Sequence, residues 1–116
     1  MKIERFDSNG RFHTAIKYNG VLYLSGAVGP NGSTVKEQAQ ETLDNLDALL
    51  KKYGSDKRHI LSACVYLKDI ASFNEFNSVW DAWVESGCEP TRTCVEAKLA
   101  SPAMLVEVTL TAALCE

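Results

Sequence analysis

Arg92 is the residue of this chain whose type and position best suit it to bind a small anion. It follows Pro90 in residues 88–99, where polar and apolar residues alternate as they do in a strand. The proline fixes the entering backbone, so the guanidinium offers two parallel donors to a carboxylate. Cys94 and Glu96 share its expected face. A structural ion pair between Arg92 and Glu96, or another acid, is the alternative interpretation.

Cysteine and histidine spacing gives no sign of a metal site. Six residues are the soft ligands of the chain: Cys64, Cys88, Cys94, Cys115, His13 and His59. They form no CxxC pair, and neither histidine is close to a cysteine pair in the sequence. We therefore expect no bound metal and, because no signal sequence is recognisable, a reducing cytoplasmic compartment. Cys94 as a covalent nucleophile stays open as an alternative, although no histidine is near it in sequence.

Composition narrows the function classes further. The 116 residues are 46% hydrophobic and 23% charged, which is ordinary for one globular domain, and we assign residues 1–116 to it. No window has the apolar length of a membrane span. The net charge of −3 argues against a nucleic-acid partner, because binding phosphates normally requires a basic patch.

The first half of the chain predicts short strands followed by a helix. Residues 2–6, 13–18 and 21–25 have strand character, and Asn19-Gly20 is typical of a two-residue hairpin turn. Thr34 and Glu37 form a capping box that predicts the start of a long helix ending near Gly54. Its apolar stripe is expected to pack on a sheet.

Residues 60–67 are a nearly continuous apolar run, which favours a central strand covered on both faces. Ser72 and Glu75 repeat the capping box and predict a second helix. Trp80 and Trp83, one turn apart on this helix, are expected in the core. Asn77 lies off their stripe, so it faces either solvent or a neighbouring subunit.

Two further strands are expected at residues 91–99 and 105–114. In the first, Thr93 and Val95 would face the core, which leaves Arg92 and Cys94 on the other face. In the second, alternation places Glu107 on that same face. The two strands should not be direct neighbours, because a tight hairpin would set Glu96 opposite Glu107.

These elements predict an α+β domain of two layers, with two helices packed on one face of a mixed sheet. The expected open face carries Arg92, Cys94 and Glu107, and a second subunit is its natural cover.

Five segments carry a resemblance to a known family: YLSG at 23–26, QAQETLDNLDALLKKYGS, VYLKDIASFNEFNSVW, EPTRTCVEAKL and VEVTLTAAL. Together they span nearly the full length. The chain resembles the Rid family, the RidA/YjgF-like imine and enamine deaminases. That resemblance implies a chorismate-mutase-like subunit, a homotrimer with sites at the subunit clefts, and no cofactor.

The resemblance also implies roles for individual residues. Arg92 matches the family's carboxylate-binding arginine and Glu107 its water-handling glutamate. Pocket positions fall on Ser25, Asn77 and Cys94. Phe12 stands where many members have tyrosine, and Ala27 stands where they usually have glutamine, so we expect a sister subgroup with a changed substrate range.

The activity implied is that of a 2-iminobutanoate/2-iminopropanoate deaminase-like hydrolase, which converts reactive 2-imino or enamine acids to 2-keto acids and ammonia in metabolite damage control. The alternative is a trimeric ligand-binding or regulatory protein that recognises small keto or imino acids without turnover. Nuclease or translation-inhibitor activity finds no support in this acidic chain.

Overall fold

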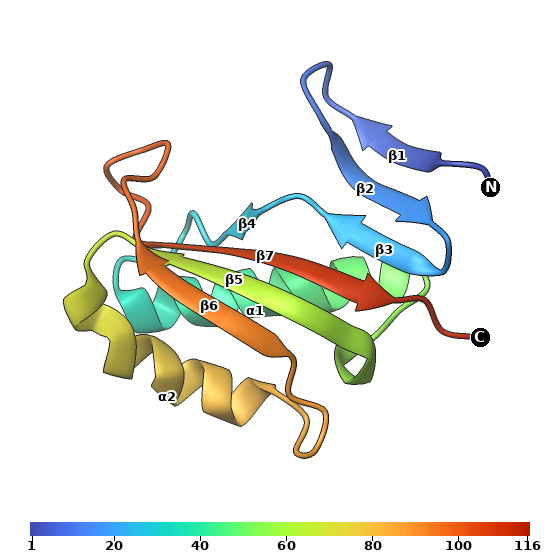
Figure 1. The fold of residues 1–116 in the computed structure, drawn as a ribbon. Helices are drawn as coiled ribbons and strands as arrows, with labels where there is room; N and C mark the ends of the chain where they lie inside the picture. The colour runs from blue at the N-terminus through green and yellow to red at the C-terminus, as the bar shows by residue number, and fades with distance from the viewer.

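A single sheet forms one layer of the protein, and both helices lie against one of its faces (Figure 1). The computed structural model describes all residues from Met1 to Glu116. The helices are α1 (Val35–Lys52) and α2 (Phe73–Trp83), with short 3-10 helices at Lys57–His59 and Ile70–Ser72. The strands are β1 (Glu4–Ser8), β2 (His13–Tyr18), β3 (Val21–Leu24), β4 (Ala27–Val28), β5 (Ile60–Leu67), β6 (Thr91–Glu96) and β7 (Val106–Ala113).

The strand order is β1-β2-β3-β7-β5-β6, and β4 also pairs with β7. All pairs are antiparallel except β5 with β6, which are joined through α2 and run parallel. A parallel pair needs such a crossover, so the sheet is mixed as predicted. Because β5 separates β6 from β7, the expectation that the last two strands are not neighbours is confirmed.

Local signals at the hairpin and at α1 are confirmed. Tyr18 pairs with Val21, and the two turn residues between them have φ of 53° at Asn19 and 78° at Gly20, as this turn type requires. The Thr34 side chain accepts a hydrogen bond from the Glu37 amide, and the Glu37 side chain accepts one from the Thr34 amide. The capping box therefore fixes where α1 begins.

The second predicted capping box is wrong. Ser72 makes no side-chain cap, and Glu75 instead accepts a hydrogen bond from the backbone amide of Lys36 at 2.9 Å. The glutamate thus satisfies an amide in the first turn of α1, which joins the two helices. Trp80 and Trp83 are buried, as expected. Neither helix combines the length and the apolar character needed to cross a membrane.

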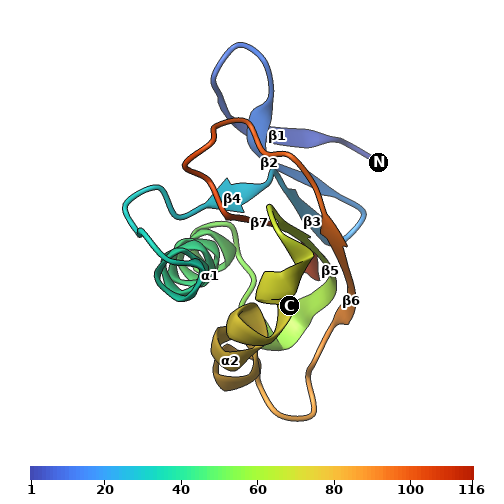
Figure 2. The same cartoon turned by 90° about the vertical axis from the view of Figure 1, so that its left-hand side faces the viewer.

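Within one chain, β5 is covered on one face only, so the expectation of two covered faces is wrong. Val65 and Leu67 are fully buried beneath the helices, whereas Cys64 and Tyr66 on the opposite face are half-buried. Figure 2 shows α1 and α2 on the same side of β7, β5 and β6. We call the uncovered side the open face.

Gln38, buried on α1, ties the helix to the segment that leads into β7. Its Nε2 donates to the carbonyls of Gly32 at 3.0 Å and Ala103 at 2.9 Å, and its Oε1 accepts from the Leu105 amide at 2.8 Å. Glu107 follows two residues later. One side chain therefore holds the backbone just ahead of a candidate site residue.

Replacing Gln38 by alanine should lower the free energy of unfolding by about 2–4 kcal/mol, because it leaves buried backbone groups without partners. Urea denaturation monitored by tryptophan fluorescence measures this change. Gln40→Ala is the matched control, since Gln40 is an exposed residue of the same helix that bonds only to Asp44. Equal stability changes in the two variants would contradict the role of Gln38.

Candidate functional site

Arg92 lies on β6 against α2, in contact with an amide and three aromatic rings. Its Nη1 donates to the Asn77 Oδ1 at 2.8 Å. Its guanidinium carbon lies 5.6, 5.9 and 5.2 Å from the ring centroids of Phe73, Phe76 and Trp80. The rings attract the cation through their π faces, and the amide fixes the plane of the fork. Asn77 therefore faces Arg92 of its own chain.

No carboxylate neutralises this guanidinium within the chain. The three ion pairs of the protein involve other residues. Glu96, the expected partner, instead accepts a hydrogen bond from the Ile70 amide at 3.1 Å. The ion-pair interpretation of Arg92 and Glu96 is therefore wrong. A positioned cation without a carboxylate partner can bind a small anion.

Cys94 lies on the same face as Arg92, two residues further along β6. Burial raises the pKa of its thiol and the neighbouring Cys64 adds to the rise, while the charge of Arg92 opposes both. Because the thiolate is the nucleophilic form, this environment disfavours Cys94 as an attacking group. Its side chain is partly buried and packs against the hydrophobic core.

Glu107 lies on the opposite face of the sheet from Arg92. Arg92 is paired with Ala63, whose side chain faces the helices, whereas Glu107 is paired with Tyr66, whose side chain is on the open face. Paired residues share a face, so the prediction that Arg92 and Cys94 lie with Glu107 on one uncovered face is wrong. The aromatic rings of α2 receive Arg92 on the helix side.

The alternation of β6 is inverted relative to the sequence prediction. Thr93 and Val95 were expected to face the core, yet both are exposed and lie on the open face. The reason is that β6 is an edge strand, and α2 covers it with side chains suited to a cation rather than to small apolar groups.

The separation within one chain is large. Glu107 and Val95 are both paired with Tyr66, and Arg92 lies three residues from Val95. Two strand spacings and three residues along the strand place the Cα atoms of Arg92 and Glu107 about 14 Å apart, with opposite side-chain directions. The two residues of one chain therefore cannot contact the same small molecule.

Glu107 borders a pocket of ≈ 280 Å³ on the open face. The pocket is lined by Tyr66, Ala97, Lys98, Leu99, Ala100, Glu107 and Thr109. Interaction with Cys64 is the main cause that raises the pKa of Tyr66, and the charge of Glu107 contributes less. The carboxylate thus faces a mixed polar and apolar hollow.

Gly26 is the site residue that sequence reasoning did not single out. A side chain there would overlap the Glu107 carboxylate, which lies directly against the glycine. The residue before it, Ser25, donates its hydroxyl to the His13 carbonyl at 2.7 Å. The one sign of this close contact in the sequence is the glycine itself, because a residue without a side chain allows another group to approach the backbone.

Phe12 precedes His13 and is 54% exposed at the connection between β1 and β2. The next residue, His13, accepts the hydrogen bond from Ser25, whose neighbour Gly26 lies against Glu107. Three strands separate β2 from β6, so Phe12 and Arg92 of one chain are on the order of 19 Å apart.

The candidate residues therefore form two groups. The arginine group is Arg92, Asn77 and Cys94, and the glutamate group is Glu107, Ser25, Gly26 and Phe12.

Comparison with known proteins identifies relatives of this arrangement. The family model described as Endoribonuclease L-PSP matches residues 2–114. A RutC family protein of Haemophilus ducreyi is 40% identical over 113 residues, covering 97% of both chains. The RutC family protein YoaB of Escherichia coli is 38% identical and covers 97% of this chain and 99% of the relative.

A solved structure agrees over the whole chain. The crystal structure of a YjgF family member from Neisseria meningitidis is 44% identical to this protein, covers 100% of it and 98% of its own chain, and superposes with a TM-score of 0.97. The match spans both the arginine and the glutamate groups. The chain therefore belongs to the endoribonuclease L-PSP family, which is the YjgF/Rid family that its motifs resemble.

Proposed function

We propose that this protein hydrolyses reactive 2-imino and enamine acids to 2-keto acids and ammonia, at sites between the subunits of a homotrimer. One observation carries the proposal: Arg92 is held by Asn77 and three aromatic rings without a carboxylate partner. Such a guanidinium matches the carboxylate that every 2-imino acid carries. The reaction class is the one that the resemblance to the Rid family implies.

The subunit arrangement follows from the two faces of the sheet. Arg92 and Glu107 of one chain lie on opposite faces, so a site that uses both must take them from different chains. The half-buried open face also favours a second copy of the chain as its cover. A homotrimer is the assembly that the family resemblance implies.

The mechanism that we propose divides the work between the two groups. Arg92 holds the substrate carboxylate with two parallel hydrogen bonds, and Glu107 of a neighbouring chain accepts a proton from the attacking water. The water oxygen bonds to the imine carbon, and the nitrogen takes up protons. The C–N bond then breaks to release ammonia as the C=O bond forms. A rate acceleration of about 10²–10⁴-fold from positioning and proton transfer is sufficient, because the uncatalysed reaction is already facile.

A ligand-binding or regulatory protein would use the same Arg92 without turnover, so ammonia release distinguishes the two functions. The family description names an endoribonuclease. An excess of 15 acidic over 12 basic residues gives no support for an RNA-binding surface. The decisive assay measures ammonia and keto acid released from a panel of imino acids generated in situ.

Arg92→Ala should reduce kcat/KM for imine hydrolysis by about 10²–10⁴-fold, because two charge-assisted hydrogen bonds to the carboxylate are lost. Arg92→Lys should also be poor, since lysine keeps the charge and loses the planar fork. Arg58→Ala, at an exposed arginine of the 3-10 helix Lys57–His59, is the control. Wild-type turnover by a folded Arg92→Ala protein would remove Arg92 from the site.

Mixing two inactive variants tests whether the site is shared. Arg92→Ala and Glu107→Gln chains, refolded together at equal amounts, should regain about a quarter of wild-type activity. About three quarters of random trimers contain both variants, and each of these has one interface with both residues intact.

Sedimentation equilibrium would show whether the mixed sample is trimeric. Mixtures that stay inactive as trimers would contradict a site that takes Arg92 and Glu107 from different chains. A stable, active monomer would contradict inter-subunit sites altogether.

Phe12→Tyr should raise turnover of small imino acids by about 2- to 13-fold, equivalent to one net hydrogen bond of about 0.5–1.5 kcal/mol. The added hydroxyl would help to orient the attacking water, so the imine of leucine should gain less than that of alanine. The measurement is kcat/KM for both imines. Tyr18→Phe, which removes a hydroxyl from an exposed tyrosine at the far end of β2, is the control. Unchanged rates for Phe12→Tyr would place Phe12 outside the site.

A further inference from the structure

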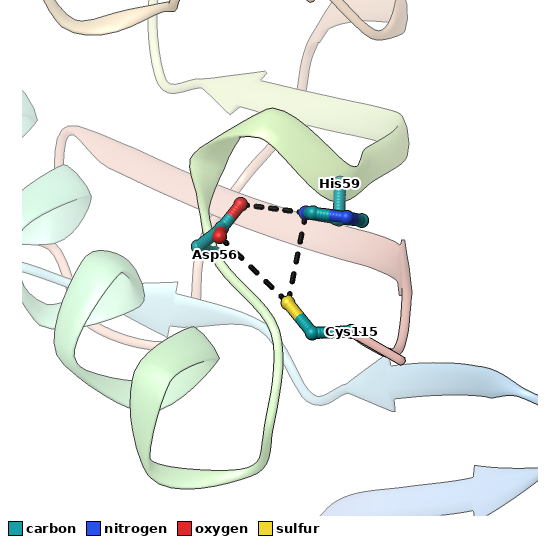
Figure 3. A group of neighbouring side chains, drawn as sticks. All are labelled: Asp56, His59 and Cys115. Atoms are coloured by element: carbon teal, nitrogen blue, oxygen red, sulfur yellow. Dashed lines mark hydrogen bonds and ion pairs between the residues drawn. The ribbon is translucent and has the colours of Figure 1, made fainter.

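Three potential metal ligands from distant parts of the sequence meet at one end of the sheet. Asp56 and His59 belong to the 3-10 helix region before β5, and Cys115 follows β7. Figure 3 shows their side chains pointing toward one another. One ligand atom from each residue lies within 4.8 Å of the other two. The fold thus brings His59 close to a cysteine that is far from it in the sequence.

The three potential ligand atoms are a nitrogen, an oxygen and a sulfur. The His59 Nδ1 lies 2.7 Å from the Asp56 Oδ1, and the Cys115 Sγ lies 3.7 Å from both the His59 Nδ1 and the Asp56 Oδ2. Tetrahedral zinc with one ligand each of sulfur, nitrogen and oxygen requires separations of about 3.4–3.6 Å between the ligand atoms. The two contacts of the sulfur are already close to that requirement.

Backbone hydrogen bonds hold the three residues in place. The Asp56 Oδ1 accepts from the Arg58 amide at 2.9 Å, which leaves Oδ2 directed at Cys115. The Cys115 amide donates to the Gly54 carbonyl at 2.8 Å, and the preceding Leu114 amide donates to Gly20 at 2.9 Å. The cluster is therefore positioned by the fold and not by its own side-chain contacts alone.

A catalytic triad does not fit this geometry. In a triad the nucleophile and the carboxylate contact different nitrogens of the histidine, which passes a proton between them. Here Asp56 and Cys115 both approach Nδ1. Three ligand atoms within 4.8 Å of one another are close enough to share one cation.

We propose that Asp56, His59 and Cys115 form a binding site for a divalent transition metal, with zinc as the best match and the fourth position open to solvent. The metal would take the Asp56 Oδ2, the His59 Nδ1 and the Cys115 Sγ. On binding, the thiol proton is released to solvent and the proton on the His59 Nδ1 is displaced, moving to Nε2 of a neutral imidazole or to solvent from an imidazolium. The metal thus replaces the hydrogen bond between the His59 Nδ1 and the Asp56 Oδ1.

Asp56 also lines a surface pocket of ≈ 350 Å³. The pocket has three acidic residues, Asp47, Asp56 and Glu85, and three basic ones, Lys51, Lys57 and Arg58. Two of the basic side chains have partners, because Lys51 pairs with Asp47 at 3.0 Å and Lys57 donates to the Trp83 carbonyl at 3.0 Å. Glu107 and Ala113 are six positions apart on β7, about 20 Å along the strand, so the metal site is distinct from the proposed deaminase site.

Cobalt(II) titration of the reduced, metal-free trimer tests the proposal. One equivalent per chain should produce a thiolate-to-cobalt charge-transfer band and the visible bands of tetrahedral cobalt, and zinc should displace it. Zinc affinity is then measured by competition with a chromophoric chelator. Cys115→Ser and His59→Gln should each weaken zinc binding by more than about 100-fold, because loss of a ligand costs more than the 10- to 100-fold typical of outer-shell changes.

Cys88→Ser is the matched control, since Cys88 lies in the loop before β6 and should leave binding unchanged. Absence of stoichiometric cobalt or zinc binding by the wild-type protein would overturn the proposal. Binding that persists unchanged in Cys115→Ser, or that is lost in Cys88→Ser, would also overturn it. Cys115 has an exposed side chain and is anchored through its backbone, so its replacement by serine is compatible with folding.

Discussion

The two faces of the β-sheet impose the constraint on which the candidate site depends. The helices bury one face, and the strand register assigns Arg92 to that face and Glu107 to the other. Neither residue can change faces without shifting its whole strand by one residue. A shift of β6 would turn Cys94 away from the core against which it packs, and a shift of β7 would move Val108 out of the core. Core packing therefore fixes the direction of both candidate side chains.

Local chemistry explains why much of the fold could be predicted from the sequence. The Asn19-Gly20 turn and the Thr34–Glu37 capping box each involve only residues near one another in the chain. The second capping box failed because Glu75 has a stronger long-range role at the amide of Lys36. Gln38 was overlooked for the same reason, since its three partners lie in two separate loops.

Sequence reasoning named candidate residues for the site but did not predict their geometry. The residues of β6 alternate between two sets, one with Arg92 and Cys94 and the other with Thr93 and Val95. Each set contains both polar and apolar side chains, so the pattern alone does not show which set faces the helices. That choice depends on Phe73, Phe76 and Trp80, which only the tertiary structure brings to Arg92. The cluster of Asp56, His59 and Cys115 was hidden because its cysteine is far from the other two residues in sequence.

Separation of Arg92 from Glu107 within a chain has an electrostatic consequence for the proposed function. Opposite charges on one face would pair with each other, and a substrate carboxylate would then have to compete with Glu107 for the guanidinium. Placement on opposite faces prevents that pairing during folding of the single chain. If assembly then brings the two groups of residues together around a small imino acid, each charge meets the substrate already oriented by its own chain. Asn77 and the aromatic rings hold the Arg92 guanidinium, while Gly26 has no side chain and so leaves space for the Glu107 carboxylate. Such preorganisation reduces the reorientation required at the moment of reaction, which is the condition for effective positioning.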